Sequence, residues 1–242
     1  MLVLAIESAT PAQSVALVDG DRLVAESSYR ADGTRGGRLL PTVDAVMREA
    51  GLAPRDLDVV AVSVGPGSFT GVRVGLATAK GFVLGTGARL VGVSTLEVLA
   101  EGYPVPDITI CALLDAYRGE VYAALFRRQG GLLTRLGADA VLPPEAVAAT
   151  VKGEAHLIGD GAARYRERLE VSFGIRAILT EEGLSAAPSA VMVARLGLRR
   201  LGQLQPGEPA TAEVAPVYLR RAEAEVNWEK GLVKSPLAKI VR

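Results

Sequence analysis

Residues 62–81, VSVGPGSFTGVRVGLATAKG, decide the fold that this sequence predicts. The apolar run at residues 59–64 is typical of a buried strand, and the segment after the glycines predicts a helix over residues 70–85. A strand that passes through such a turn into a helix points backbone N–H groups at whatever lies above the turn. The stretch therefore predicts an α/β protein whose glycine loop either binds an anion or, as we favour, lets strand and helix pack closely.

The predicted helix carries apolar or small residues on both of its sides. At about 100° per residue, one side consists of Val72, Leu76, Ala79 and Val83. The opposite side has small or apolar residues, and two cations accompany it: Val74, Thr78, Gly81 and Gly85, with Arg73 and Lys80. A helix that is apolar all round is expected to be buried on both sides. The small-residue side then faces either a partner protein or another element of the chain, such as the helix predicted over residues 188–204, and periodicity alone does not decide between them.

Composition excludes several classes of protein. The 242 residues contain 27 basic and 27 acidic side chains, whereas a protein that binds nucleic acid by itself usually has a basic excess. Cys111 and His156 are single, which excludes an internal disulfide and argues against a transition-metal site or a histidine-based nucleophile. We expect a buried strand thiol and a core or edge histidine. Since neither a signal peptide nor a membrane span is predicted, we expect a cytoplasmic protein without metal or cofactor.

The order of the predicted elements repeats. Strands at residues 2–6, 14–19 and 22–29, a helix at 39–50 and the stretch described above make a first unit. Prolines 104 and 106 then precede a second strand pair at 108–114 and 120–126, a strand at 132–142, a helix after residue 144, a strand at 155–158 and a glycine turn at 159–161. We therefore expect a lobe at residues 1–103, a degenerate lobe at 104–204 whose last helix packs back on the first, and a linker and tail at 205–242.

Two sets of charged side chains are expected at the surface. Arg118 and Glu120, in the hairpin that turns at residues 115–119, should be solvated or pair with each other. Six arginines are expected on solvated helix faces: Arg164, Arg166, Arg168, Arg195, Arg199 and Arg200.

Five segments of the chain together resemble the TsaB family of bacterial tRNA threonylcarbamoyladenosine biosynthesis. They are LLP at 39–41, the block at 63–81, VGVSTL at 91–96, DAYRGEVY at 115–122 and PVYLR at 216–220. Members of this family are paralogues of the catalytic subunit TsaD. The resemblance, together with the duplicated unit, implies the two-lobed actin-like (ribonuclease H-like) fold of the sugar kinase and Hsp70 ATPase superfamily, with mixed sheets flanked by helices.

The same resemblance implies a function and its partners. The chain would be a non-catalytic subunit, paired as a heterodimer with a TsaD-like catalytic paralogue and assisted by a TsaE-like ATPase subunit. The complex transfers threonylcarbamoyl to N6 of the tRNA adenosine 3′ of the anticodon, so tRNA is met through the complex. The resemblance also places the partner interface on the small-residue side of the helix at residues 70–85, and it leaves open whether the isolated chain forms a homodimer.

Departures from the superfamily pattern argue against catalysis. The first hairpin of sugar kinases reads Asp-x-Gly-x-Thr, but this chain has Glu7-Ser8-Ala9-Thr10, so a Cβ stands where a phosphate would approach. TsaD-like proteins bind their metal through two histidines on the helix before the glycine loop, whereas residues 38–45 contain none. No catalytic residue or metal ligand is therefore predicted, and a protease-like activity fails for the same reason. The rival function is an autonomous ATP-dependent phosphotransferase. A second-choice anion or nucleotide contact would involve Gly65, Gly67, Ser68 and Thr70.

Overall fold

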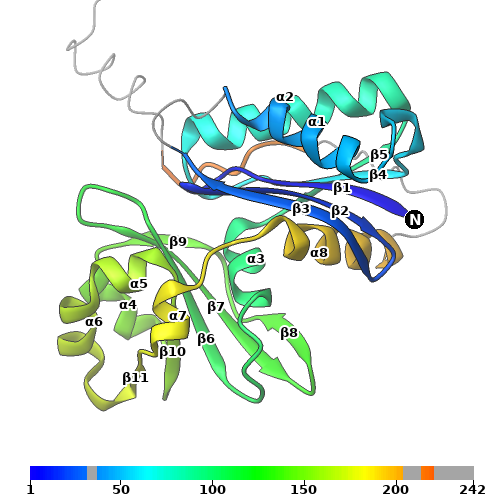
Figure 1. The fold of residues 1–242 in the computed structure, drawn as a ribbon. Helices are drawn as coiled ribbons and strands as arrows, with labels where there is room; N and C mark the ends of the chain where they lie inside the picture. Colours follow the sequence, from blue (N-terminus) through cyan, green and yellow to red (C-terminus); the bar gives the residue numbers. More distant parts are fainter. Residues whose placement is uncertain (32–36, 204–213, 221–242) are drawn as a thin grey trace, which may run out of the picture.

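The chain folds into two lobes, and each lobe is built around one mixed sheet (Figure 1). The computed structural model describes residues 1–31, 37–203 and 214–220. The first sheet has the order β3-β2-β1-β4-β5, and its strands are β1 (Leu2–Glu7), β2 (Ala12–Asp19), β3 (Arg22–Arg30), β4 (Val59–Ser63) and β5 (Arg89–Val93). β1 pairs antiparallel with β2 and parallel with β4, so the β-meander and the strand before the glycine loop meet at the centre of one sheet.

Helices cover both faces of the first sheet (Figure 1). α1 (Leu39–Glu49) and α2 (Phe69–Thr86) pack on the face that includes Leu4 and Ile6. α8 (Ala190–Gln203) packs on the opposite face, where Val3 and Ala5 point, because side chains alternate along a strand. The helix at the end of the second half of the sequence thus returns to cover the sheet of the first lobe.

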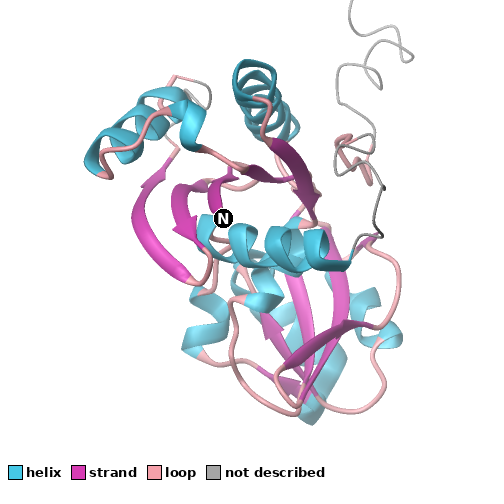
Figure 2. Cartoon of the chain, turned by 90° about the vertical axis from the view of Figure 1, so that its right-hand side faces the viewer, coloured by secondary structure: helices cyan, strands magenta, loops and turns pink. Residues whose placement is uncertain are grey.

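The second sheet has the order β11-β10-β6-β7-β8, and β9 also pairs with β7. Its strands are β6 (Thr109–Asp115), β7 (Val121–Gln129), β8 (Leu132–Arg135), β9 (Ala140–Leu142), β10 (Ala155–Ile158) and β11 (Ala177–Ile178). α3 (Thr95–Glu101) packs on one face, and α4 (Pro144–Thr150), α5 (Asp160–Arg164) and α6 (Arg166–Phe173) cover the other. α7 (Glu181–Ser185) lies beside β10, and two short 3-10 turns are η1 (Pro54–Asp56) and η2 (Gly174–Arg176). Figure 2 shows the strands as layers with helices on either side.

Two local predictions are wrong. Residues 132–142 form two strands instead of one, because segment 136–139 bulges out and Ala140 pairs with Ala123, two positions beyond the register of β8. The glycine turn at residues 159–161 is the start of α5, where Gly159 takes a φ of 98° as its N-cap. Most of the predicted linker and tail at 205–242 lies outside the described residues. Among the described helices, none is long and apolar enough to cross a membrane.

Candidate functional site

α2 has one side buried in the core of the first lobe. The Ser68 side chain caps the helix by accepting a hydrogen bond from the Gly71 N–H at 3.2 Å, and Gly87 ends it with a left-handed φ of 75°. Val72, Leu76 and Ala79 are buried, and Val83 packs against the same core. The predicted inward side of this helix is confirmed.

The opposite side of α2 is open over the second half of the helix, whereas Val74, near the start of that side, is half-buried and packs against the first core. Gly81 and Gly85 are exposed, and no described atom lies within 4 Å of a Cβ added at either glycine. Leu84 beside them is 88% exposed, Lys80 is exposed, and Thr78 is half-buried. In the single chain, no described element therefore covers the side around Gly81 and Gly85, and of the two alternatives for this side a partner stays a prediction. The helix at the end of the second lobe does not cover this side, because α8 packs on the far face of the sheet.

An apolar groove runs beside this open side, between α1 and α2. One half, of about 500 Å³, is lined by Ala77, Thr78, Gly81, Gly85 and neighbouring residues. The other half, of about 460 Å³, lies along α1, and Leu40, Pro54 and Phe82 line both halves. Leu40, on α1, is 57% exposed at this groove. We call the open side of α2 together with this groove the α1–α2 face.

The chain itself fills the space around the glycine loop. The Ser68 N–H donates to the Ala9 carbonyl at 2.7 Å, and the Ser8 hydroxyl donates to the Gly71 carbonyl at 2.9 Å. A Cβ at Gly67 would overlap the Ala9 carbonyl, and a Cβ at Gly71 would overlap that of Ser8. These glycines let the β1–β2 turn pack directly on the first turn of α2.

The four residues of the predicted anion contact are thus placed differently from one another. A Cβ at Gly65 would lie 2.7 Å from the Val217 carbonyl oxygen, and one at Gly67 would overlap the Ala9 carbonyl, so backbone of this chain lies against both glycines. Gly67 nevertheless also lines the cleft between the lobes. Ser68 uses its hydroxyl as the helix cap, although it also lines the cleft between the lobes with Thr70. An anion contact stays a prediction, and the cleft is where Ser68 and Thr70 could make it.

Glu7 stands where sugar kinases have their phosphate-site aspartate. It is fully buried at the end of β1, and burial raises the pKa of its carboxyl group from 4.5 to about 7, although the Ser63 hydroxyl and the backbone N–H groups of Ala9 and Thr10 oppose the shift. Glu7 Oε1 accepts the Ala9 N–H at 2.7 Å. The carboxyl group therefore holds its own turn together.

The single cysteine and histidine lie in the second sheet. Cys111 is buried in β6, and burial raises the pKa of its thiol to about 12. His156 lies on β10 with its Nδ1 at 2.9 Å from the Tyr103 hydroxyl, and burial lowers the pKa of its imidazole. Within the described ranges, no three His, Cys, Asp or Glu side chains gather in a group that could hold a metal ion.

A cleft of about 820 Å³ separates the lobes. One wall is the first turn of α2, the facing wall is the β6–β7 hairpin, and residues 217–220 close a third side. Tyr117 and Arg118, at the tip of the hairpin, have φ values of 58° and 55°. Glu120 forms its ion pair with Arg220, against the prediction of a solvated side chain or an Arg118 partner.

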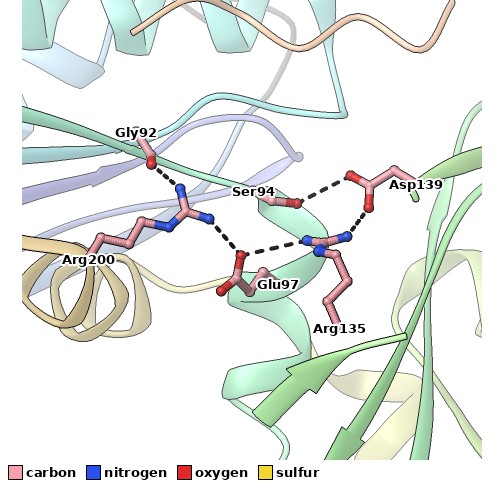
Figure 3. A network of polar contacts seen from close by, with 6 residues as sticks. All are labelled: Gly92, Ser94, Glu97, Arg135, Asp139 and Arg200. Carbon is pink, nitrogen blue, oxygen red and sulfur yellow. Dashed lines mark hydrogen bonds and ion pairs between the residues drawn. The ribbon is translucent and has the colours of Figure 1, made fainter. Parts of the chain in front are cut away.

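Several arginines that were expected to be solvated join helices to their neighbours. Arg200 donates to the Gly92 carbonyl and pairs with Glu97 at 2.7 Å, and Glu97 lies 3.6 Å from Arg135 (Figure 3). Arg135 pairs with Asp139 in the bulge after β8. Three more pairs are Arg199 with Glu101, Arg164 with Asp115, and Arg168 with Glu145. Periodicity could not reveal these partners, because all but one are distant in sequence.

Known proteins match the chain over most of its length. The family model for TsaD, tRNA N6-adenosine threonylcarbamoyltransferase, matches residues 36–228. The tRNA threonylcarbamoyladenosine biosynthesis protein TsaB of Escherichia coli (strain K12) is 32% identical over 95% of this chain and 98% of its own. The chain belongs to the TsaB family. The protein of the same name from Bacillus subtilis (strain 168) is 29% identical over 94% of this chain and 98% of its own.

Solved structures agree with the family and the fold. YeaZ from Pseudomonas aeruginosa superposes with a TM-score of 0.77 at 31% identity, covering 90% of this chain and 99% of that one. A ROK hexokinase from Thermus thermophilus, at 11% identity and a TM-score of 0.50, covers 84% of this chain and 100% of that one and shares the fold alone. The predicted two-lobed actin-like fold is confirmed.

Proposed function

We propose that the chain is a non-catalytic subunit required for threonylcarbamoyl transfer to N6 of the tRNA adenosine 3′ of the anticodon. It pairs with a TsaD-like catalytic paralogue and holds the lobes of that paralogue in a competent arrangement. A TsaE-like ATPase subunit completes the assembly, and tRNA is met through the complex. The names of its full-length relatives support the pathway.

The open α1–α2 face is the observation that carries the pairing. Gly81 and Gly85 have no Cβ, so the backbone of a partner helix can approach α2 closely there. Leu84 and Leu40 offer exposed apolar side chains on either side of that approach. An apolar groove bordered by small residues on a helix is a surface that an amphipathic helix fits. A second copy of this chain presents α2 itself, and we propose that the TsaD-like paralogue presents an equivalent helix.

The filled glycine loop supports the non-catalytic part of the proposal. A glycine loop that binds phosphate needs free backbone N–H groups and open space above its glycines. Here the Ala9 and Ser8 carbonyls lie against Gly67 and Gly71, so that room is taken by the backbone. Residues 38–45, at the start of α1, also contain no histidine.

Gly81→Arg tests the pairing. The change places a long cation in the centre of a desolvated contact, so we expect association with the purified TsaD-like paralogue to weaken at least about thirtyfold, together with loss of tRNA modification by the complex. The matched control is Gly202→Arg, at an exposed glycine of α8 that also has no described atom within 4 Å of an added Cβ. Association is measured by analytical ultracentrifugation and the melt by circular dichroism.

The outcomes separate folding from binding. A Gly81→Arg protein that melts cooperatively yet pairs and supports modification like the Gly202→Arg control excludes this face as the interface. Leu84→Asp is a second variant on the same face, at a side chain so exposed that its replacement should leave folding intact. Normal pairing in both variants would rule out the proposal.

A further inference from the structure

Residues 214–220 contact both lobes, and residues 217–220 form one side of the cleft. We call residues 214–220 the strap. On the first lobe, the Val217 N–H donates to the Val64 carbonyl at 2.7 Å, which extends the end of β4. Val214 packs against the core of the same lobe, and its side chain lies so close to Gly92 that a Cβ there would be 2.8 Å from it. The backbone of the strap is therefore seated on the carboxyl end of the first sheet.

One residue of α2 holds the middle of the strap. The Arg73 Nε–H donates to the Tyr218 hydroxyl at 2.8 Å. The Tyr218 ring lies 5.0 Å from the Phe69 ring, and the Arg73 guanidinium sits 3.7 Å above Phe69. Arg73, predicted as a partner-interface residue, thus contacts the strap within its own chain. The Arg73 guanidinium stacks on the Phe69 ring and is hydrogen-bonded to Tyr218, so it fixes the position of Tyr218 beside Phe69 at the start of α2.

The far end of the strap holds the hairpin of the second lobe. Leu219 packs against the second core, and Arg220 donates to the Ala116 carbonyl at 2.7 Å while pairing with Glu120. Ala116 and Glu120 flank Tyr117 and Arg118, whose positive φ values cost energy for residues with side chains. Arg220 therefore contacts both flanks of this turn and adds to the hydrogen bond from the Tyr117 N–H to Asp115 Oδ1 at 2.9 Å that also holds it.

We propose that the strap couples the first turn of α2 to the β6–β7 turn across the cleft, so that a change at Arg73 alters a turn that Arg73 does not touch. The path runs from Arg73 through Tyr218 and Arg220 to the Ala116 carbonyl and the Glu120 carboxylate. Since α2 is the contact helix of the proposed pair, partner binding reaches the cleft by the same path; this consequence rests on the proposed function.

Hydrogen exchange of the full, isolated chain tests the coupling. In the turn, the Ala116 N–H donates to the Glu120 carbonyl at 3.0 Å, and the Glu120 N–H donates to the Tyr117 carbonyl at 3.1 Å, so both amides report on its opening. We expect Arg220→Gln to speed their exchange about tenfold, because it removes both charge-assisted contacts to the turn. Arg73→Gln should speed it about threefold, because it removes only the charge-assisted hydrogen bond that holds Tyr218. The control is Lys80→Gln, on the same helix and also exposed, which should leave the exchange of both amides in the isolated chain unchanged.

Two results would overturn the coupling. One is wild-type exchange at the turn in a folded Arg73→Gln protein, and the other is an equal increase in Lys80→Gln, which would mean general destabilisation. A second measurement adds the TsaD-like paralogue and expects the exchange of the turn to change in the wild type but not in Arg73→Gln. A paralogue that binds without any change at the turn contradicts the link to pairing. A paralogue that fails to bind contradicts both the proposed function and the link between pairing and the turn. The exchange rates of the isolated chain still test the coupling through the strap in that case.

Discussion

Glu7 keeps a carboxyl group fully buried inside the first lobe, at the end of β1. Its neighbours in the turn are backbone N–H groups, and burial favours its neutral form. The folded pKa of about 7 lies above the ordinary value of 4.5, so folding takes up a proton between these two pH values. The residue therefore makes the free energy of unfolding depend on pH between about 4.5 and 7.

Glu7→Gln should remove this dependence. The contribution of the raised pKa is fully present below pH 4.5 and is lost as pH rises to 7, because the unfolded chain ionises first. We expect the wild type to lose about 2 kcal/mol relative to Glu7→Gln between roughly pH 5 and pH 8. Urea unfolding of both chains at the two pH values measures it. Parallel losses in the two chains would contradict the assignment to Glu7.

α2 uses glycine for two opposite purposes along one element. Gly71, and Gly75 one turn later, lie against Ser8 so closely that a Cβ would overlap it. A Cβ added at Gly81 or Gly85 would have no described atom within 4 Å, so the helix backbone is exposed on the outer side. The inner pair serves packing within the chain, and we have proposed that the outer pair serves packing between chains.

A pair of alanine substitutions separates these purposes. Gly71→Ala should lower the free energy of unfolding by about 2 kcal/mol or more, because its Cβ meets the Ser8 carbonyl, which cannot move without displacing the turn. Gly81→Ala should raise it by up to about 1 kcal/mol, since alanine favours a helix and meets no atom there. Denaturant titration of both variants decides the matter. Equal effects would mean that the close approach of the β1–β2 turn is not what requires Gly71.

The two lobes are joined by contacts between elements that are far apart in the sequence. α3 follows the last strand of the first sheet, packs on the second sheet and carries Glu97 between Arg200 of α8 and Arg135 of β8 (Figure 3). The strap adds a second crossing at the cleft. The relative position of the lobes therefore depends on side chains from four separate parts of the sequence.

Glu97→Gln should weaken the joint between the lobes. Removing the carboxylate leaves Arg135 and Arg200 without their shared counter-charge, and we expect a loss of about 1 kcal/mol that shrinks at high salt, because the network is partly exposed. Asp44→Asn, which removes an exposed pair with Arg48 on α1, is the control and should cost less than about 0.5 kcal/mol. Unfolding in urea at low and high salt compares them. A loss no larger than that of the control would show that the network contributes nothing to the joint.

Local sequence determined the elements and their buried sides. The spacing of Val72, Leu76 and Ala79 places them on one side of a helix whatever surrounds it, and alternation does the same for Val3 and Leu4 in β1. The glycine loop could likewise be located from residues 65–71 alone. Periods of 3.6 and 2 residues are properties of the backbone, so they can be read without knowing the partners of an element.

Only the tertiary structure decided what each side meets. It carried α8 to the far face of the first sheet, which left Gly81 and Gly85 open, and it brought Arg220 to Glu120 across 100 residues. It also showed that the Ala9 and Ser8 carbonyls, not a ligand, occupy the space above Gly67 and Gly71. Such contacts join residues that are far apart along the chain, and their energies depend on where whole elements pack, which no local spacing encodes.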